Sequence, residues 1–559
     1  MGIRTAMEST LARHSGSERT DSHRSRHWVA VGALTALVAV LYSVFALAQN
    51  YTYKTSSYDL VIFDEAVRSY ARFKPGISLV KGMHNGFGPN FSILGDHWSP
   101  ILASLAPLYW IYGRPETLLV AQAVLFALAI PPIWLFTRRA FGGGHKATIA
   151  AYLVSVAYAL SWPIASALAF DFHEVAFAPV LMAVALECLQ AGRLRTALIA
   201  LAALLLVKED MGLLVAGIGV YLMVSRPRTV RRQLAVGTAL IVVGLADSFI
   251  ATYWLIPAFG GRSDYYWAYT ALGHNAPQAV AHLITHPSSL RLLIMPRVKL
   301  VTMLWLFGAF CFLPLRSPLG LATVPLLAER MLANLFPNWW VTSFQYNAYL
   351  AVILACAAAD GAVRLDRDLS RWRCRAAERA GPEAEATRRP ADAVPAADVG
   401  TPPSAPKLAP RRAGAVALAG AVAMCAVAVV LISHFAFGAA LHRSFYQQDK
   451  QVKDAAAAVA VVLSGVTVEA VNFLGPHLSG RDTVLLWDGD GTTPPYAAPW
   501  VIANNRQLQF TFHSVREQKE HIALLERHGY RVVFRRGGYL VLHRPGGTGS
   551  LAVSKEPTR

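Results

Sequence analysis

Residues 28–48, WVAVGALTALVAVLYSVFALA, form an apolar stretch without a charged residue near the start of the chain. A helix needs about 20 such residues to cross the hydrocarbon core of a membrane, so this stretch is long enough to span it. Five arginines lie within residues 1–27, and no cleavage site of small residues is evident before the next polar stretch. We therefore expect an uncleaved first transmembrane helix, with residues 1–27 as a cytoplasmic tail.

The composition is that of a membrane protein throughout. Of the 559 residues, 54% are hydrophobic and 15% are charged, which leaves too few polar side chains to coat a soluble body of this size. The formal net charge of +18 would suggest nucleic-acid binding in a soluble protein. Here the basic residues are spread over short loops without a contiguous basic face, so nucleic acid is disfavoured as a partner. The five cysteines show neither a disulfide framework nor a CxxC zinc pattern.

The same length criterion predicts about eleven transmembrane helices, some of them short and shielded by their neighbours. With the N-terminus inside, all the connections expected in the cytoplasm are basic, as the positive-inside rule requires. An odd number of spans places the C-terminus outside the cell. The predicted spans are 28–48, 117–137, 147–162, 174–190, 196–207, 211–225, 234–256, 298–315, 318–333, 346–360 and 413–435.

The segments between and after these spans differ in composition. Residues 28–360 form a transmembrane core that carries one long outer loop, residues 50–115. Residues 361–412 are rich in Ala, Pro and Arg, and we expect them to be a disordered cytoplasmic linker before the last transmembrane helix, residues 413–435.

Residues 436–559 have the pattern of a small extracytoplasmic α/β domain. The strand-like runs VTVEAV, DTVLLW and PWVIAN precede a helical stretch, VREQKEHIALLERHG. In YRVVFRRGGYLVLHR, two alternating apolar segments flank Gly537-Gly538, which is typical of a β-hairpin. The domain contains neither a phosphate-binding loop nor a nucleophile elbow.

The outer loop contains the first candidate for chemistry. In YDLVIFDEAVRSYARF, residues 58–73, the apolar positions fit one face of a helix that lies along the membrane surface. Asp64 and Glu65 lie within it, and ionised carboxylates near hydrocarbon are costly unless they face water or serve a function. The alternative is a solvated helix face on which Asp64 pairs with Arg68, four residues later.

Two further clusters combine carboxylates with histidines. Asp96 and His97 lie in GDHWSP, and Asp171, His173 and Glu174 lie in AFDFHEVAF. We expect them to converge at the membrane surface, where they could bind a divalent cation, Mg²⁺ or Mn²⁺, or supply a general base and its orienting partner. The metal candidates are Asp96, His97, Asp171 and His173, and the alternative role of these side chains is to anchor loops by hydrogen bonds.

Lys208, Glu209 and Asp210 lie between two short apolar runs in LLVKEDMGLL. A lysine near the outer leaflet suits a lipid phosphate, which the two carboxylates could orient or neutralise. An internal salt bridge at a helix break is the alternative. Two later outer segments add charged and aromatic residues suited to sugars and lipid head groups, although aromatic belts at the membrane surface look the same in sequence. These substrate-binding candidates are Arg262, Glu329 and Tyr346.

Four stretches resemble one known family. YDLVIFDEA, LGDHWSPILASLAPLYWIYG, AFDFHEVAFAP and LLVKEDMGLL, in this order, are similar to the bacterial membrane proteins grouped as domain of unknown function 2079. The likeness extends over most of residues 50–360 and includes the C-terminal domain that ends in GYLVLHR. That family in turn resembles the GT-C superfamily of membrane glycosyltransferases, in which the acidic motif of the mannosyltransferases is similar to Phe63-Asp64-Glu65.

The resemblance implies a GT-C-like, inverting glycosyltransferase in the bacterial plasma membrane. Its donor would be a sugar linked to a polyprenyl phosphate, a membrane lipid, and its acceptor an envelope molecule on the outer face. Asp64 would be the catalytic base, with Glu65 beside it, and Lys208 would hold the donor phosphate. His97, Asp171 and His173 would orient the acceptor or bind a metal.

Two other classes of protein remain open. A transporter or flippase would use the same intramembrane charges to line a path, and it predicts inverted repeats with broken helices. Residues 28–225 and 234–435 show no such self-similarity. A non-catalytic scaffold for envelope assembly would suit the flexible linker and the outer domain.

Overall fold

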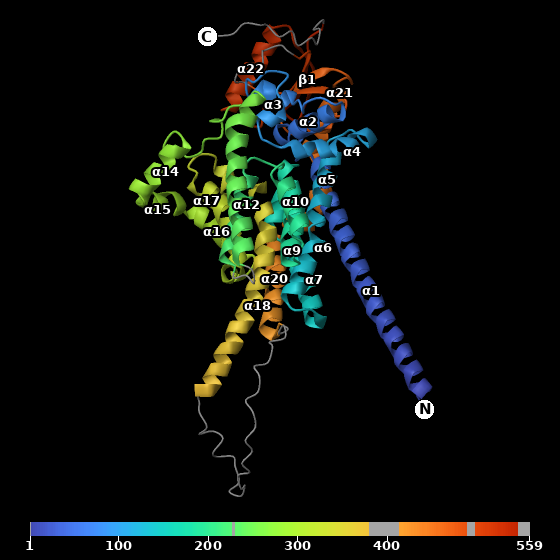
Figure 1. Ribbon diagram of the computed structural model, residues 1–559. Coiled ribbons are helices and arrows are strands. Elements are labelled where there is room, and N and C mark those ends of the chain that lie inside the picture. The colour runs from blue at the N-terminus through green and yellow to red at the C-terminus, as the bar shows by residue number, and fades with distance from the viewer. Residues whose placement is uncertain (1, 226–229, 380–412, 489–497, 546–559) are drawn as a thin grey trace.

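The computed structural model describes residues 2–225, 230–379, 413–488 and 498–545 (Figure 1). Long helices form a bundle, and the small sheet domain lies at one of its ends together with the segment that follows the first helix. We call this end of the molecule the sheet end. The bundle helices are α1 (Gly2–Tyr51), α5 (Glu116–Ala127), α6 (Ile130–Ala140), α7 (Gly144–Ala159), α8 (Trp162–Ala169), α9 (Phe177–Gln190), α10 (Leu194–Leu204), α11 (Met211–Val224), α12 (Val230–Ile250), α16 (Arg297–Gly308), α17 (Val324–Leu332), α18 (Ala348–Arg379) and α20 (Ala415–Leu431).

Six helices in the described part of the chain are long and apolar enough to cross a membrane. They coincide with six of the predicted spans, whereas α10 and α11 are shorter apolar helices. The predicted spans 174–190, 298–315 and 318–333 contain only the short helices α9, α16 and α17. The count of eleven is therefore not confirmed. The six long helices are Ser25–Tyr51, Glu116–Ala140, Gly144–Ala169, Arg231–Ala258, Gln345–Ala376 and Ala415–His434.

The predicted disordered linker requires a correction at its start. Residues 361–379 continue α18 as a helix, whereas the linker was expected to begin at residue 361. The ion pair from Arg364 Nε to Asp360 Oδ2, at 2.6 Å and one helical turn apart, supports this extension. The Pro-rich stretch on which the expectation rested lies within residues 380–412, which are outside the described residues.

Short elements lie between the first two bundle helices, at the sheet end. The predicted surface helix 58–73 consists of a π-helical turn, η1 (Ser57–Val61), followed by α2 (Ile62–Ala71). Most of its apolar residues are buried in the protein, with Leu60 and Val67 completely inaccessible, whereas Phe73 after the end of α2 is exposed. The remaining short helices are α3 (Leu79–His84), α4 (Ala106–Ile111), α13 (Ile256–Ala258), α14 (Ala276–Thr285) and α15 (Ser288–Ile294).

The C-terminal domain is a five-stranded sheet with strand order β2-β1-β3-β5-β4. The central strand β3 is parallel to β1 and antiparallel to β5, and β1 is also parallel to β2. The strands predicted from sequence, the helix and the hairpin are all confirmed. Gly537 and Gly538 form the hairpin turn with φ of 61° and 95°, a left-handed conformation that favours glycine. The elements are α21 (Lys450–Val461), β1 (Thr467–Ala470), β2 (Thr483–Leu486), β3 (Trp500–Asn504), α22 (Val515–Arg527), β4 (Arg531–Arg536) and β5 (Tyr539–His543).

Close packing of α11 against α12 depends on glycine. A Cβ atom on Gly244 would overlap the backbone oxygen of Gly212, and a Cβ atom on Gly212 would overlap that of Gly244. Small residues at such a crossing let the two backbones approach, which is a common device in membrane helices. The contact matters for function because the last turn of α12 lines a cavity at the sheet end.

We expect Gly244→Leu to lower the melting temperature of the detergent-solubilised protein, because overpacking at this crossing costs on the order of 1–3 kcal/mol. Gly32→Leu is the matched control, since a Cβ atom at this membrane position meets nothing within 4 Å. Equal melting temperatures for the two variants would contradict the packing described for α11 and α12.

Candidate functional site

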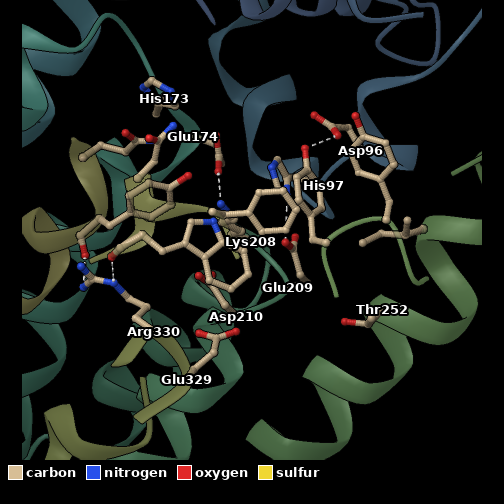
Figure 2. A pocket seen from close by; sticks show the side chains of 18 of the residues that line it. Asp96, His97, His173, Glu174, Lys208, Glu209, Asp210, Thr252, Glu329 and Arg330 are labelled. Carbon is tan, nitrogen blue, oxygen red and sulfur yellow. Dashed lines mark hydrogen bonds and ion pairs between the residues drawn. The ribbon is translucent and has the colours of Figure 1, made fainter. Parts of the chain in front are cut away.

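A cavity of about 780 Å³ lies at the sheet end of the bundle. It collects side chains from segments that are far apart in the sequence, and Figure 2 labels ten of them. Its lining contains thirteen aromatic residues, six carboxylates, two lysines, two arginines and two histidines. A largely aromatic wall with a few convergent polar groups is typical of a ligand site. The ionisable residues are Asp59, Lys81, Asp96, His97, His173, Glu174, Lys208, Glu209, Asp210, Arg262, Glu329 and Arg330.

One ion pair forms the wall nearest the sheet domain. Lys81 Nζ lies 2.9 Å from Asp96 Oδ1, and both side chains are buried. The hydroxyl of Tyr266 donates to the same carboxylate oxygen at 2.7 Å. The ammonium also lies 5.3 Å from the ring centroids of Tyr58 and Tyr265, within the range of a cation–π contact. Asp96 therefore neutralises Lys81 inside an aromatic enclosure. Burial raises the pKa of Asp96, but Lys81, His97 and the hydroxyl of Tyr266 together lower it further, so the net shift is downward.

His97 connects the outer loop to the turn between α10 and α11. Its Nδ1 lies 2.8 Å from Glu209 Oε1, and the backbone N–H of Trp98 donates to Glu209 Oε2 at 3.1 Å. The imidazole ring stacks on Tyr266 with a centroid distance of 4.8 Å. Burial and Lys208 lower the pKa of His97, but Glu209 and Asp96 raise it further, so the net shift is upward. The histidine thus fixes the turn that carries Lys208.

Lys208 lies near the centre of the view in Figure 2. Its Nζ is 3.4 Å from Glu174 Oε1 and 5.6 Å from the ring centroid of Tyr346. Burial alone would lower the pKa of this lysine, but Glu174, Asp210 and Glu209 raise it well above its usual value. A lysine carries three N–H donors, and the long contact to Glu174 leaves room for an anionic ligand.

Asp59 and His173 form the polar pair at the start of η1. His173 Nε2 lies 3.3 Å from Asp59 Oδ1, and the hydroxyl of Ser56 donates to Asp59 Oδ2 at 3.3 Å. The same hydroxyl lies 2.7 Å from Asp171 Oδ2, which also accepts the backbone N–H of Ser56 at 2.9 Å. The side chain of Asp59 is 24% exposed, so its carboxylate can reach a ligand in the cavity.

The remaining charged and polar residues of the lining have different surroundings. Arg330 is almost completely buried and donates to the carbonyl oxygens of Trp339 and Tyr346, at 2.8 and 2.6 Å. Arg262 lies at the mouth of the cavity and pairs with Asp264 at 2.9 Å, with both side chains exposed. Glu329 and Tyr346 line the cavity as expected.

Asp64 and Glu65 are not among the residues that line the cavity. Asp64 is completely buried, accepts hydrogen bonds from Arg68 Nη2 at 2.9 and 2.8 Å, and accepts a third from the hydroxyl of Tyr109 at 2.7 Å. Glu65 accepts the backbone N–H of Val80 at 2.9 Å, and burial raises its pKa to about 8. The geometry thus gives both carboxylates structural partners. Asp64 pairs with Arg68, as the alternative expected, but it lies in the protein interior and not on a solvated helix face.

Sequence reasoning did not single out Asp59 and Lys81. Asp59 belongs to the same YDLVIFDEA stretch as Asp64 but precedes the helix, where its side chain turns toward His173. The sequence could have pointed to Asp59 by elimination, because the position of Asp64 predicts that Asp64 is buried. Asp64 lies four residues after Leu60 and three before Val67, on the apolar stripe of the helix, and is therefore expected to be buried.

The geometry does not fit the predicted metal site. No group of three or more His, Cys, Asp or Glu side chains in the described ranges lies close enough to hold a metal ion. Asp96 is occupied by Lys81, His97 by Glu209 and Asp171 by Ser56. His173 contacts Asp59, to which Ser56 also bonds, so each of the four candidates already has a partner, and no chemical step here involves a cation.

Fold and cavity together define a helical membrane protein with a polar site at one end of its bundle. Residues 49–379 match the family described as predicted membrane protein DUF2079, and the chain belongs to this family. The crystal structure of ArnT from Cupriavidus metallidurans bound to undecaprenyl phosphate is similar over 92% of this chain and 97% of that one, with 15% sequence identity and a TM-score of 0.47. The comparison with curated proteins gives no match.

We expect Asp64→Ala to lower the melting temperature far more than Asp59→Ala. Removing one partner of a buried ion pair costs about 3–5 kcal/mol, and the partial exposure of Arg68 reduces this loss only in part. Asp59 is partly exposed and more loosely bonded, so its loss removes little. Thermal unfolding of both variants in the same detergent measures the difference, and a greater loss for Asp59→Ala would contradict the roles assigned here.

Asp171 should make the stability depend on pH. Burial, and then the negative charge of Asp59, raise the pKa of Asp171 from 3.8 to about 7. The folded protein therefore binds this proton more tightly than the unfolded chain. The resulting stabilisation is full below about pH 4 and is lost as the pH rises through 7. Asp171→Asn keeps an oxygen acceptor for Ser56 but does not titrate.

The melting temperature of Asp171→Asn should consequently gain on that of the wild type as the pH is raised from 4 to 8. The difference between the two proteins isolates Asp171, because other buried carboxyls titrate in both. Parallel melting curves across this range would show that Asp171 does not hold its proton in the folded protein.

Proposed function

We propose that this protein is a membrane glycosyltransferase that moves a sugar from a polyprenyl-phosphate donor to an envelope acceptor at the outer face of the bacterial plasma membrane. The observation that carries the proposal is the arrangement of Asp59 and Lys208 in one cavity at the end of the bundle. A carboxylate base and an ammonium for a phosphate leaving group are the two charges that this reaction requires.

The position of the cavity supports a lipid-linked substrate. Ser248, Phe249, Thr252, Tyr253 and Ile256 line it, and all five belong to the long apolar helix Arg231–Ala258. Phe249 and Tyr253 are also 56% and 37% exposed, on a helix that is mostly unburied. A ligand in the cavity therefore lies beside a membrane-spanning helix, where a lipid head group is close at hand.

The charges of the cavity support a donor with one phosphate. Lys208 engages Glu174 only loosely, at 3.4 Å, whereas Lys81 is fully engaged by Asp96 and Tyr266. Arg330 is directed at backbone carbonyls. Lys208 is thus the cation best placed to meet a phosphate, and the carboxylates around it disfavour ligands of high negative charge.

Asp59 supplies the base in this proposal. Its carboxylate accepts the proton of the acceptor hydroxyl while the hydroxyl oxygen forms a bond to the anomeric carbon. The bond from that carbon to the phosphate oxygen breaks, and the electron pair leaves on the phosphate, whose charge Lys208 stabilises. Attack opposite the leaving group inverts the configuration at the sugar. His173 holds Asp59 in place through its Nε2 contact.

We expect Asp59→Asn to abolish the activity and Glu65→Gln to preserve it. Both variants change a carboxylate of the same segment to an amide, but only Asp59 lines the cavity. A deletion strain complemented with each variant is compared with the wild type by mass spectrometry of envelope glycolipids and lipid-linked sugars. Loss of a general base should reduce the product at least about 100-fold.

The expected result is a glycosylated species that is missing in the deletion strain, with its unmodified acceptor accumulated, and restored by Glu65→Gln but not by Asp59→Asn. Expression of both variants in the membrane is verified by immunoblot. Full restoration by Asp59→Asn would overturn the catalytic assignment and favour the transporter or scaffold.

A further inference from the structure

The sheet domain contacts the chain directly beside Asp59. The carbonyl oxygen of Asn472 accepts the backbone N–H of Ser57 at 2.7 Å and the Ser57 hydroxyl at 2.8 Å. The side-chain Oδ1 of Asn472 accepts the backbone N–H of Tyr58 at 2.9 Å. Asn472 follows β1 and lies more than 400 residues after its partners, so these three bonds join the two ends of the chain.

Neighbouring contacts tighten the same junction. The ring of His477 stacks on Tyr53 with a centroid distance of 3.6 Å and an angle of 18° between the planes. Gly475 packs so closely on Ser57 that a Cβ atom at this glycine would overlap the Ser57 hydroxyl. The loop after β1 therefore packs closely against residues 53–58.

A second contact supports the segment of the cavity wall that carries Lys81. His84 Nδ1, at the end of α3, lies 2.8 Å from Asp488 Oδ2 of the sheet domain. Phe510 packs beside this histidine and beside Tyr58, with centroid distances of 6.0 and 5.6 Å. Because α3 also carries Lys81, the sheet domain holds both segments that supply this side of the cavity.

From these contacts we infer that the sheet domain fixes the position of Asp59, and that Asn472 is the positioning residue through which it acts. The inference rests on the proposed function, in which Asp59 is the base. Asp59 follows Tyr58 in η1, so the N–H group held by Asn472 belongs to the residue next to the base. A displacement of about 1 Å in a reacting group can reduce a rate about 100-fold.

Asn472→Leu in the full-length protein removes the Oδ1 acceptor while the backbone carbonyl stays. Asn472→Asp keeps an oxygen at the same place and is the conservative variant. Arg516→Ala is the matched control from the same domain, because Arg516 is 88% exposed and pairs only with Glu520 within α22 among the contacts described. All three are compared with wild type and Asp59→Asn in the complementation assay, by the amount of glycolipid product.

Hydrogen–deuterium exchange of the purified proteins provides a readout that does not depend on activity. Asn472→Leu should speed exchange in peptides that cover residues 57–63 and leave the rest of the protein and its melting temperature unchanged. It should also lower the product about 10- to 100-fold. Asn472→Asp should restore both readouts, and Arg516→Ala should match the wild type in both.

Unchanged exchange at residues 57–63 in Asn472→Leu would overturn the inference, and so would normal product with faster exchange. A fully active Asp59→Asn is the separate result that defeats the proposed function. In that case Asn472 positions no base, whatever the exchange shows, and the inference fails because the proposed function has failed.

Discussion

The pairing of ionised side chains dominates the structure at the sheet end, because a charge close to hydrocarbon is costly unless an opposite charge accompanies it. Lys81 lies on Asp96, His97 on Glu209, and Lys208 on Glu174. The pair Lys81–Asp96 lies within the segment between α1 and α5, whereas the other two pairs each join segments that are distant in sequence. The ion pairs therefore do more than line the cavity, since they also bring the segment between α1 and α5, the segment between α8 and α9 and the turn after α10 to one place.

Among the paired charges of the cavity, Lys208 and Asp59 have the longest contacts. Lys208 meets Glu174 at 3.4 Å, and Asp59 meets His173 and Ser56 at 3.3 Å each, whereas the ion pairs Lys81–Asp96 and His97–Glu209 are shorter than 3 Å. Loosely bonded charges can turn to a ligand at small cost, and tightly paired ones serve to hold the wall. This difference separates the residues that we assign to chemistry from those that we assign to structure.

Much of this arrangement could be predicted from the sequence. The length of the apolar runs predicted the six long helices. Strand-like apolar runs and a Gly-Gly turn between alternating apolar segments predicted the strands and hairpin of the sheet domain. Asp96, His97, Asp171, His173 and Glu174 were expected to converge, and all of these except Asp171 line one cavity. Short helices such as α16 and α17 could not be distinguished from spans, since apolar runs of that length suit both a buried segment and a shielded crossing.

The choice between Asp59 and Asp64 lay beyond simple motif reading. Both carboxylates precede or begin the same helix, and only the packing of Leu60, Phe63 and Val67 decides which of them is buried. The role of Asn472 was still less accessible, because a contact across more than 400 residues leaves no periodic trace in the sequence. Long-range hydrogen bonds of this kind depend on tertiary placement, which composition and periodicity do not encode.

Native mass spectrometry of the purified protein, incubated with undecaprenyl phosphate, tests most directly whether the cavity takes a lipid-linked phosphate. We predict that the wild type retains one lipid adduct and that Lys208→Met loses it, while the exposed variant Arg516→Ala retains it as the wild type does. A wild type without an adduct, or a Lys208→Met variant that holds the lipid equally well, would contradict the account.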